Sequence, residues 1–323
     1  MTNSNSASAP ATLPGGQLGI GIQLPIQAQS PVFCDDWEAD ATVDDLVAIA
    51  QAADRAGLHY IGACDHVAIP HAAAEAMSDV WYDPVATLGL LGGVTERVRL
   101  LTHVYVLGYR HPLQAAKSFA TLDHLSGGRL VVGVGAGHVE GEFAALGADF
   151  AGRGKVLDEA IAALDAGLRD EFPEFDGETW QFGGLGVAPR PVQQPRPPIW
   201  VGGSSKPAMR RAARLGDGWL PQGTSRKKLP DQVAFIRSER AAAGRDDPIE
   251  LGAFAEPVRV GKPDFEIPKW ALSGSGERIA ASLREFGELG ASHVQVKFLA
   301  RSAADLCGQL AAFGDEVIPL LTK

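Results

Sequence analysis

The sequence predicts an α/β protein with a (β/α)8 TIM barrel fold. Short apolar runs alternate with segments of helical spacing from residue 18 onward, and this alternation gives eight strand–helix units. The apolar runs are nearly continuous, as is typical of parallel strands that are buried on both faces of a sheet. Eight such units in 323 residues fit a closed barrel better than an open doubly wound sheet.

The predicted strands and helices alternate along the chain. Strands are expected at residues 18–25, 60–66, 98–107, 129–137, 199–203, 218–223, 249–260 and 293–299. Helices are expected at residues 43–56, 83–95, 112–126, 155–168, 207–215, 229–243, 276–289 and 303–321. Gly57 ends the first helix, because glycine is common just beyond a helix C-terminus, and Pro84 and Pro112 open the next two. Residues 170–198 are rich in proline, glycine and aromatic residues, which indicates a loop or insertion outside the repeat.

The composition excludes several classes of function. Hydrophobic residues make up 46% of the chain, yet no uncharged apolar run reaches the length of about 18 residues that a transmembrane helix needs. The net charge of −10 disfavours nucleic acids and anionic membranes as partners. Three separated cysteines without zinc-ligand spacing predict reduced thiols and no metal site. Residues 1–16 are small and polar, which predicts a disordered leader on a cytoplasmic protein, with residues 17–323 forming one domain.

Proton-capable side chains gather where barrel chemistry is expected, at the C-terminal ends of the predicted strands. His66, His103 and His138 lie there, and histidine is the natural proton carrier near neutral pH. Two interpretations of His66 stay open: it carries a proton, or it orders its loop by bonding Asp65 or the backbone. His103 lies within its strand and is either a core histidine or a ligand contact. Glu140 and Glu142 are either an acid/base pair or members of a surface network in which one pairs with Arg153, and for Glu142 the surface network is favoured.

Two glycine-rich turns follow predicted strands. Residues 202–205, Gly-Gly-Ser-Ser, enter a helix and are suited to hold a phosphate on free backbone N–H groups, although an ordinary turn explains the pattern equally well. The run GVGAG at residues 133–137 is not a dinucleotide fingerprint, because its third glycine is misplaced. It predicts instead a strand that needs close backbone approach to a flat ligand. Neither GxSxG nor HExxH occurs, which argues against an esterase or a zinc hydrolase.

Three blocks of the sequence resemble the bacterial luciferase-like flavin and deazaflavin oxidoreductases. They are RHP at 110–112, ATLDHLSGGR at 120–129, and PPIWVGG at 197–203 followed by AARLGDGW at 212–219. The resemblance extends from residue 18 to the end and is greatest for the branch that uses coenzyme F420 in place of FMN. It implies a TIM barrel with an insertion near the active-site mouth, a homodimer and a small-molecule substrate.

The resemblance also implies where the coenzyme lies. Its ring is expected against a bulge in the third strand, with a cis peptide between His103 and Val104. The implied coenzyme-binding residues are Asp65, His66, Thr102, His103, Val104, Val106, Ala136, His138, Val201, Gly202, Gly203 and Ser204. His138 stands where the sugar-phosphate dehydrogenases of this family have an acidic residue, so that reaction is not expected here.

We therefore expect an F420-dependent oxidoreductase in which His66 and His138 are the catalytic residues that assist proton transfer. Two alternatives stay open. The first is an FMN-dependent monooxygenase that receives reduced flavin from a separate reductase. The second is a barrel that binds a ligand without turnover.

Overall fold

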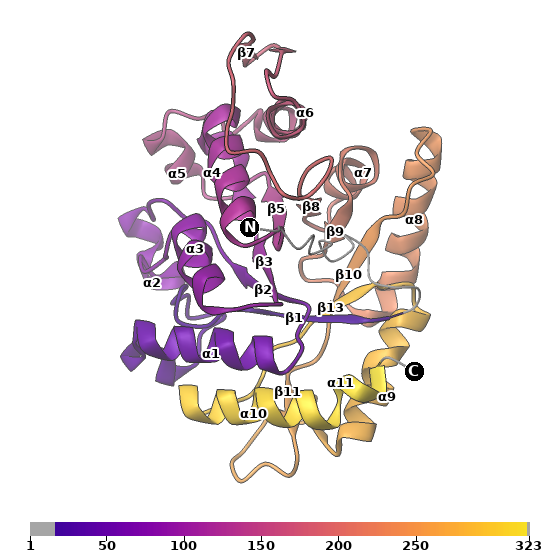
Figure 1. Cartoon of the computed structure of the whole chain (residues 1–323). Coiled ribbons are helices and arrows are strands. Elements are labelled where there is room, and N and C mark those ends of the chain that lie inside the picture. Colours follow the sequence, from indigo (N-terminus) through magenta and orange to yellow (C-terminus); the bar gives the residue numbers. More distant parts are fainter. Residues whose placement is uncertain (1–16, 322–323) are drawn as a thin grey trace, which may run out of the picture.

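The computed structural model describes residues 17–321 and forms a closed parallel barrel surrounded by helices (Figure 1). The barrel strands are β1 (Gly19–Gln23), β2 (Tyr60–Ala63), β3 (Arg99–Thr102), β5 (Leu130–Gly135), β8 (Ile199–Gly202), β9 (Gly218–Leu220), β10 (Glu250–Phe254) and β13 (His293–Gln295). Each strand pairs in parallel with the next, and β13 pairs back onto β1. The predicted fold class is confirmed. The leader predicted at residues 1–16 lies outside the described residues, and the division into a leader and one domain stays a prediction.

The third barrel strand is interrupted rather than continuous. It is divided into β3 and β4 (Tyr105–Val106), and a cis peptide joins His103 to Val104 between them, as the resemblance implied. Beyond the interruption, β4 continues along β5, with Val106 opposite Gly135. His103 and Val104 therefore project from the break in the strand, where both contact the cavity described below.

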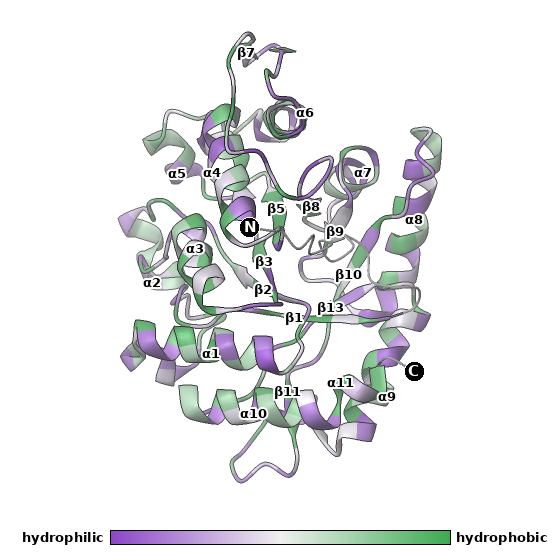
Figure 2. Cartoon of the chain, viewed as in Figure 1, coloured by the Kyte–Doolittle hydropathy of each residue, from purple (hydrophilic) through white to green (hydrophobic). Residues whose placement is uncertain are grey.

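Eight long helices cover the barrel, and most of them begin at a capping side chain. They are α1 (Val43–Arg55), α3 (Pro84–Val94), α4 (Pro112–Leu125), α6 (Arg153–Arg169), α7 (Lys206–Leu215), α8 (Leu229–Ala242), α9 (Gly276–Glu288) and α10 (Ala303–Glu316). Thr42, Asp83, Ser205, Ser275 and Ser302 each accept a hydrogen bond from a backbone N–H of the first turn. Hydrophobic and hydrophilic residues alternate along these helices (Figure 2). Shorter helices are α2 (Ala74–Met77), α5 (Glu140–Ala145) and α11 (Ile318–Leu321), and single helical turns lie at η1 (Asp36–Asp40), η2 (His71–Ala73), η3 (Leu107–Tyr109) and η4 (Arg226–Lys228).

The barrel interior is filled by large side chains that face glycines on neighbouring strands. A Cβ atom on Gly21 would lie 2.2 Å from the ring of Tyr60, and one on Gly218 would lie 2.2 Å from Trp200. The ring of His293 stacks on Trp200 with centroids 4.2 Å apart. Tyr60, Trp200 and His293 lie at or near the N-terminal ends of their strands, so their rings fill that end of the barrel. The open space therefore lies at the C-terminal ends of the strands.

Two further features of the structure differ from the prediction. The strand expected at 249–260 is two strands, β10 in the barrel and β11 (Val258–Val260) outside it, paired with β12 (Leu272–Gly274). Pro257 lies at the break, and proline has no N–H to continue a ladder. The helix α5 was not expected, and it carries Glu142 under the loop that follows β2.

Residues 170–198 lie outside the repeat, as predicted. They include an antiparallel pair, β6 (Phe175–Asp176) and β7 (Gln181–Phe182). Glu159 of α6 accepts from the backbone of Thr179 and Trp180, at 2.7 and 3.0 Å. The segment thus lies along the outer helices, and none of its residues lines the cavity near which the insertion was expected.

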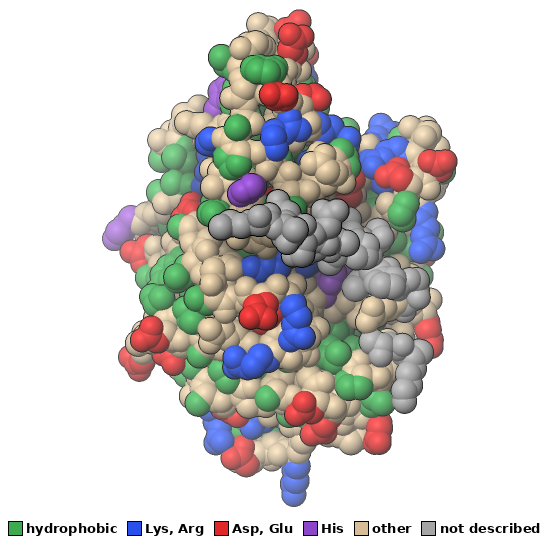
Figure 3. Space-filling model, in the orientation of Figure 1, with side chains coloured by type: hydrophobic (Ala, Val, Ile, Leu, Met, Phe, Trp, Pro, Cys, Tyr) green, Lys and Arg blue, Asp and Glu red, His purple; other side chains and the backbone are tan. Residues whose placement is uncertain are grey.

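Two observations concern the membrane and nucleic-acid partners that the composition disfavoured. None of the helices within residues 17–321 has both the length and the apolar character needed to cross a lipid bilayer. On the face shown in Figure 3, Lys and Arg side chains are interspersed with Asp and Glu rather than gathered into one basic surface.

Candidate active site

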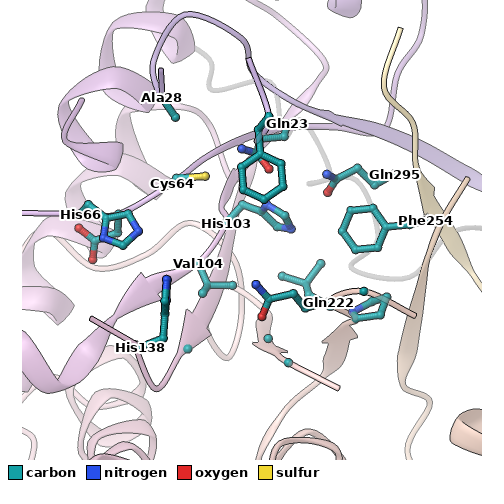
Figure 4. A pocket seen from close by; sticks show the side chains of 18 of the residues that line it. Gln23, Ala28, Cys64, His66, His103, Val104, His138, Gln222, Phe254 and Gln295 are labelled. Atoms are coloured by element: carbon teal, nitrogen blue, oxygen red, sulfur yellow. The ribbon is translucent and has the colours of Figure 1, made fainter. Parts of the chain in front are cut away.

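A cavity of about 860 Å³ lies at the C-terminal ends of the barrel strands. Every barrel strand contributes a residue at or just after its end: Gln23, Cys64, His103, Gly135, Gly202, Leu220, Phe254 and Gln295. Figure 4 shows His66 and His138 on one side of this space and Gln222, Phe254 and Gln295 on the other. Its volume falls in the range of small-molecule and cofactor sites, roughly 300–1,000 Å³.

Most of the predicted coenzyme-binding residues line this cavity. They are Asp65, His66, His103, Val104, Val106, Ala136, His138, Gly202 and Gly203. The other three do not line it. Thr102 and Val201 are fully buried, and the Thr102 hydroxyl donates to the carbonyl of Gly133 at 2.8 Å. The Ser204 hydroxyl shares a hydrogen bond with that of Thr224 and accepts from the backbone N–H of Gln222.

His66 is hydrogen-bonded to Glu142, whereas the sequence suggested Asp65 or the backbone as a partner of His66 and Arg153 as a partner of Glu142. The Nδ1 atom of His66 lies 2.9 Å from Oε2 of Glu142, whose side chain is fully buried. The interpretation of Glu142 as a surface partner of Arg153 was wrong, because α5 directs the carboxylate inward beneath the loop after β2. Arg153 instead donates to the carbonyl of Phe150 and lies over its ring.

The carboxylate of Asp65 forms an ion pair with Arg110 and does not bond His66. Both terminal nitrogens of Arg110 donate to its carboxylate, and the backbone N–H of Val106 donates to the same group at 2.8 Å. Arg110 also lies over the ring of Tyr105, at 4.2 Å from the centroid. Asp65 therefore ties the end of β2 to β4 and stabilises the bulge that carries His103 and Val104.

The two predicted catalytic histidines lie side by side. The rings of His66 and His138 are edge to face with centroids 5.5 Å apart, and the ring of Trp81 also contacts His66, with centroids 4.3 Å apart. Partial desolvation and the neighbouring His66 both lower the pKa of His138, while Glu142 raises it less. His138 is therefore neutral at neutral pH and can accept a proton from a bound molecule.

His103 provides a third imidazole, which projects into the middle of the view in Figure 4. Burial lowers its pKa to about 4, so the ring is uncharged at neutral pH. Its Nδ1 atom has no hydrogen-bond partner within residues 17–321. The ring of Phe254 lies 6.4 Å away, and together the two residues give this side of the cavity an uncharged aromatic wall.

The end of the cavity at the N-terminus of α7 is suited to an anion. The turn at Gly202 and Gly203 leads into α7, whose N-cap Ser205 also lines the space. Gly203 has a φ of 109°, a conformation that favours glycine. Helix N-termini present free N–H groups and the positive end of the helix dipole to a ligand.

Two arginines add positive charge at this end, and sequence reasoning did not assign either to the cavity. Arg211 of α7 is engaged by Asp158 and by the carbonyl of Gly154, whereas Arg153 has no carboxylate partner within residues 17–321. They are 58 positions apart in the chain, so no local motif could reveal them; the packing of α6 against α7 brings them together.

The residues that line the cavity fit a ligand with a flat ring and an anionic tail. Gly135, Ala136 and Gly137 present a wall without large side chains, next to Val104. A Cβ atom on Gly135 would lie 2.4 Å from Val104, so close packing of the bulge requires this glycine. The imidazoles of His66 and His138 and the N-terminus of α7 line the same cavity as this wall.

Comparisons with known proteins agree with this geometry. A model of the luciferase-like monooxygenase family matches residues 22–264. The FMNH2-dependent dimethylsulfone monooxygenase of Pseudomonas putida is 32% identical over 209 residues, which are 64% of this chain and 56% of that protein. This chain therefore spans little more than half the length of that relative.

The fold is shared with solved structures, among them a monooxygenase and a reductase. A monooxygenase from Streptomyces bottropensis superposes with a TM-score of 0.76 at 21% identity and covers 94% of this chain and 99% of its own. The coenzyme F420-dependent tetrahydromethanopterin reductase of Methanopyrus kandleri has a TM-score of 0.73 at 19% identity, with the same coverage. At these identities the likeness shows the fold alone.

Proposed function

The chain belongs to the luciferase-like monooxygenase family, and from this premise we propose that it is an oxidoreductase that uses the deazaflavin coenzyme F420 on a small organic substrate. The observation that carries the proposal is that one cavity is lined both by a pair of imidazoles and by the turn that leads into the N-terminus of α7. When bound, F420 would supply a ring carbon that gives a hydride to the substrate or takes one from it.

The residues of this chain would bind the coenzyme and move the proton. The backbone at Gly203 and the charge of Arg153 would hold the anionic tail, and the wall formed by residues 135–137 would support the ring. His66 or His138 would give a proton to the substrate or take one from it, since both line the cavity and histidine is the side chain that most often serves as a general acid or base.

A second candidate is an FMN-dependent monooxygenase that receives reduced flavin from a separate reductase. The observation that favours it is the Pseudomonas putida relative, whose name states dependence on FMNH2. Both coenzymes pair a tricyclic ring with an anionic tail, so the same cavity residues would serve either one.

Anaerobic titration with reduced F420 and with reduced FMN, followed by coenzyme fluorescence, tests the proposal. We expect tighter binding of F420 and substrate turnover without oxygen consumption. Tighter binding of FMN, together with oxygen consumption that matches product formation, would establish the second candidate. Absence of binding to either coenzyme would favour a barrel that binds another ligand without turnover.

We further propose a cytoplasmic homodimer without nucleic-acid or membrane partners. The net charge of −10 disfavours nucleic acids and anionic membranes as partners, and three cysteines that form no disulfide within residues 17–321 are compatible with the cytoplasm. The homodimer is what the family resemblance implies. Sedimentation equilibrium at several concentrations tests the oligomeric state, and a constant monomer mass would contradict it.

A further inference from the structure

Glu142 is a buried carboxylate that receives four hydrogen bonds. It lies on α5 with no exposed surface, and the Nδ1 atom of His66 is 2.9 Å from Oε2. The Tyr109 hydroxyl lies 3.1 Å from the same oxygen. The backbone N–H groups of Val67 and Ala68 donate to Oε1. Both oxygens are therefore fully used by groups of the protein.

The surroundings keep this carboxylate ionised. Burial raises the pKa of Glu142, but the hydrogen bonds from His66, Val67 and Ala68 outweigh it, and the net pKa lies below the ordinary value. Burial and the adjacent Glu142 raise the pKa of Tyr109, so its hydroxyl keeps its proton and donates it in this hydrogen bond.

The other charged groups near this network do not compete for the contact between His66 and Glu142. Asp65 and Arg110 neutralise each other in a two-point ion pair on the neighbouring strand ends. His138, whose ring lies beside that of His66, has a lowered pKa and is uncharged at neutral pH.

An ionised carboxylate fixes the tautomer of the imidazole bound to it. A carboxylate can only accept hydrogen bonds, so the Nδ1 atom of His66 must carry a proton. A neutral imidazole has one N–H, which leaves a lone pair on Nε2. No residue within 17–321 hydrogen-bonds this Nε2, and the His66 ring lines the cavity beside His138.

We propose that Glu142 is a positioning residue that fixes His66 as the Nδ1–H tautomer and so makes Nε2 its proton-accepting atom. The proposal deepens the proposed function, on which it rests for the role of His66. In the accepting direction an O–H or N–H bond of the bound molecule breaks and an Nε2–H bond forms. The molecule keeps the electron pair, and Glu142 faces the resulting imidazolium without taking its proton. The donating direction is the reverse.

Nitrogen-15 NMR of histidine-labelled protein without coenzyme tests the proposal directly. The signal of His66 is identified by its loss in His66→Gln. We expect a protonated Nδ1 and an unprotonated Nε2 in the neutral ring of the wild-type protein. In Glu142→Gln the amide NH2 can donate to Nδ1, so the Nε2–H tautomer should gain population.

Tyr109→Phe is the matched control, because it removes one hydrogen bond from the same carboxylate and keeps the charge. The tautomer of His66 should not change in this variant. A role of Glu142 in merely fastening the loop at residues 67–68 would predict no change of tautomer in Glu142→Gln. An Nε2–H tautomer in the wild-type protein would overturn the proposal by itself, even where Glu142→Gln fails to fold.

A kinetic readout follows once a turnover assay exists. Glu142→Gln should lower kcat by up to the about 10²–10⁴-fold that a positioned acid–base group contributes, with little change in KM. The acidic limb of its pH–rate profile should move to lower pH, because the variant lacks the charge that stabilises the imidazolium. Glu142→Asp should restore part of the rate. The tautomer measurement uses no coenzyme, so it stands or fails independently of the coenzyme titrations.

Discussion

The guanidinium of Arg110 donates a hydrogen bond to each carboxylate oxygen of Asp65, with nitrogen–oxygen distances of 2.7 and 2.8 Å. The Asp65 side chain is almost fully buried, and its third partner is the backbone N–H of Val106 on β4. The ion pair therefore joins the ends of two neighbouring strands beneath the bulge at His103. A residue that the sequence suggested as a coenzyme contact is, in the structure, an anchor of the cavity wall.

Asp65→Asn should destabilise the protein by about 3 kcal/mol. Breaking a buried ion pair costs about 3–5 kcal/mol because one charge is left without its partner, and the partial exposure of Arg110 favours the lower end. Urea denaturation measures the free energy of unfolding. Asp83→Asn is the matched control: Asp83 is 4.0 Å from Arg110 and exposed, and asparagine can keep its N-cap role. Equal stability of the two variants would contradict an anchoring role.

The repeating fold could be predicted because its signal is local. Buried parallel strands such as residues 130–135 require continuous apolar runs, and the helices between them begin at caps such as Ser205 and Ser302. Where one residue overrides the pattern, as Pro257 does, the prediction merged two strands into one.

The partners within the site could not be predicted, because the barrel joins residues that are distant in sequence. His66 and Glu142 are 76 positions apart, and Asp65 and Arg110 are 45 apart. The prediction paired Glu142 with Arg153 at the surface, whereas the inward direction of α5 decides its partner. Motifs indicated which strand ends carry polar groups, and packing determines which of those groups meet.

Arg153→Met should weaken coenzyme binding by about 10- to 100-fold. A hydrogen bond to a charged group contributes about 1.5–3 kcal/mol, and Arg153 is a cavity-lining cation that no carboxylate within residues 17–321 neutralises. Fluorescence titration gives the Kd. Arg210→Met on α7 is the control, because Arg210 pairs with Glu239 and does not line the cavity. An unchanged Kd in a folded Arg153→Met protein would remove Arg153 from the anion site.

His138→Ala should lower turnover by about 10²–10⁴-fold while the Kd of the coenzyme changes little. The ring is uncharged at neutral pH and lies 5.5 Å from that of His66, so both can reach one bound molecule. Steady-state kinetics from pH 5.5 to 8.5, roughly the range in which histidine titrates, measures the effect. His124→Ala, at the exposed end of α4, serves as the control. Near-normal rates in both His66→Ala and His138→Ala would assign the two histidines a structural role.

Acid should destabilise the protein through the buried imidazole of His293. This side chain is 1% exposed and stacks on Trp200, and burial, helped by His59 and His103, lowers its pKa well below the ordinary 6.5. As the pH falls below 6.5, the unfolded chain therefore takes up a proton that the folded protein does not bind. Stability is lost in that direction by up to about 1.4 kcal/mol per pH unit for one proton.

His293→Phe isolates this effect, because phenylalanine keeps an aromatic ring against Trp200 and cannot be protonated. Between pH 6 and 5 the free energy of unfolding of the wild-type protein should fall by about 1 kcal/mol more than that of the variant. Urea denaturation at each pH gives both values. His124→Gln, an exposed control, should keep the wild-type slope. Parallel pH dependences of the wild-type protein and His293→Phe would show that His293 binds its proton equally in the folded and unfolded states.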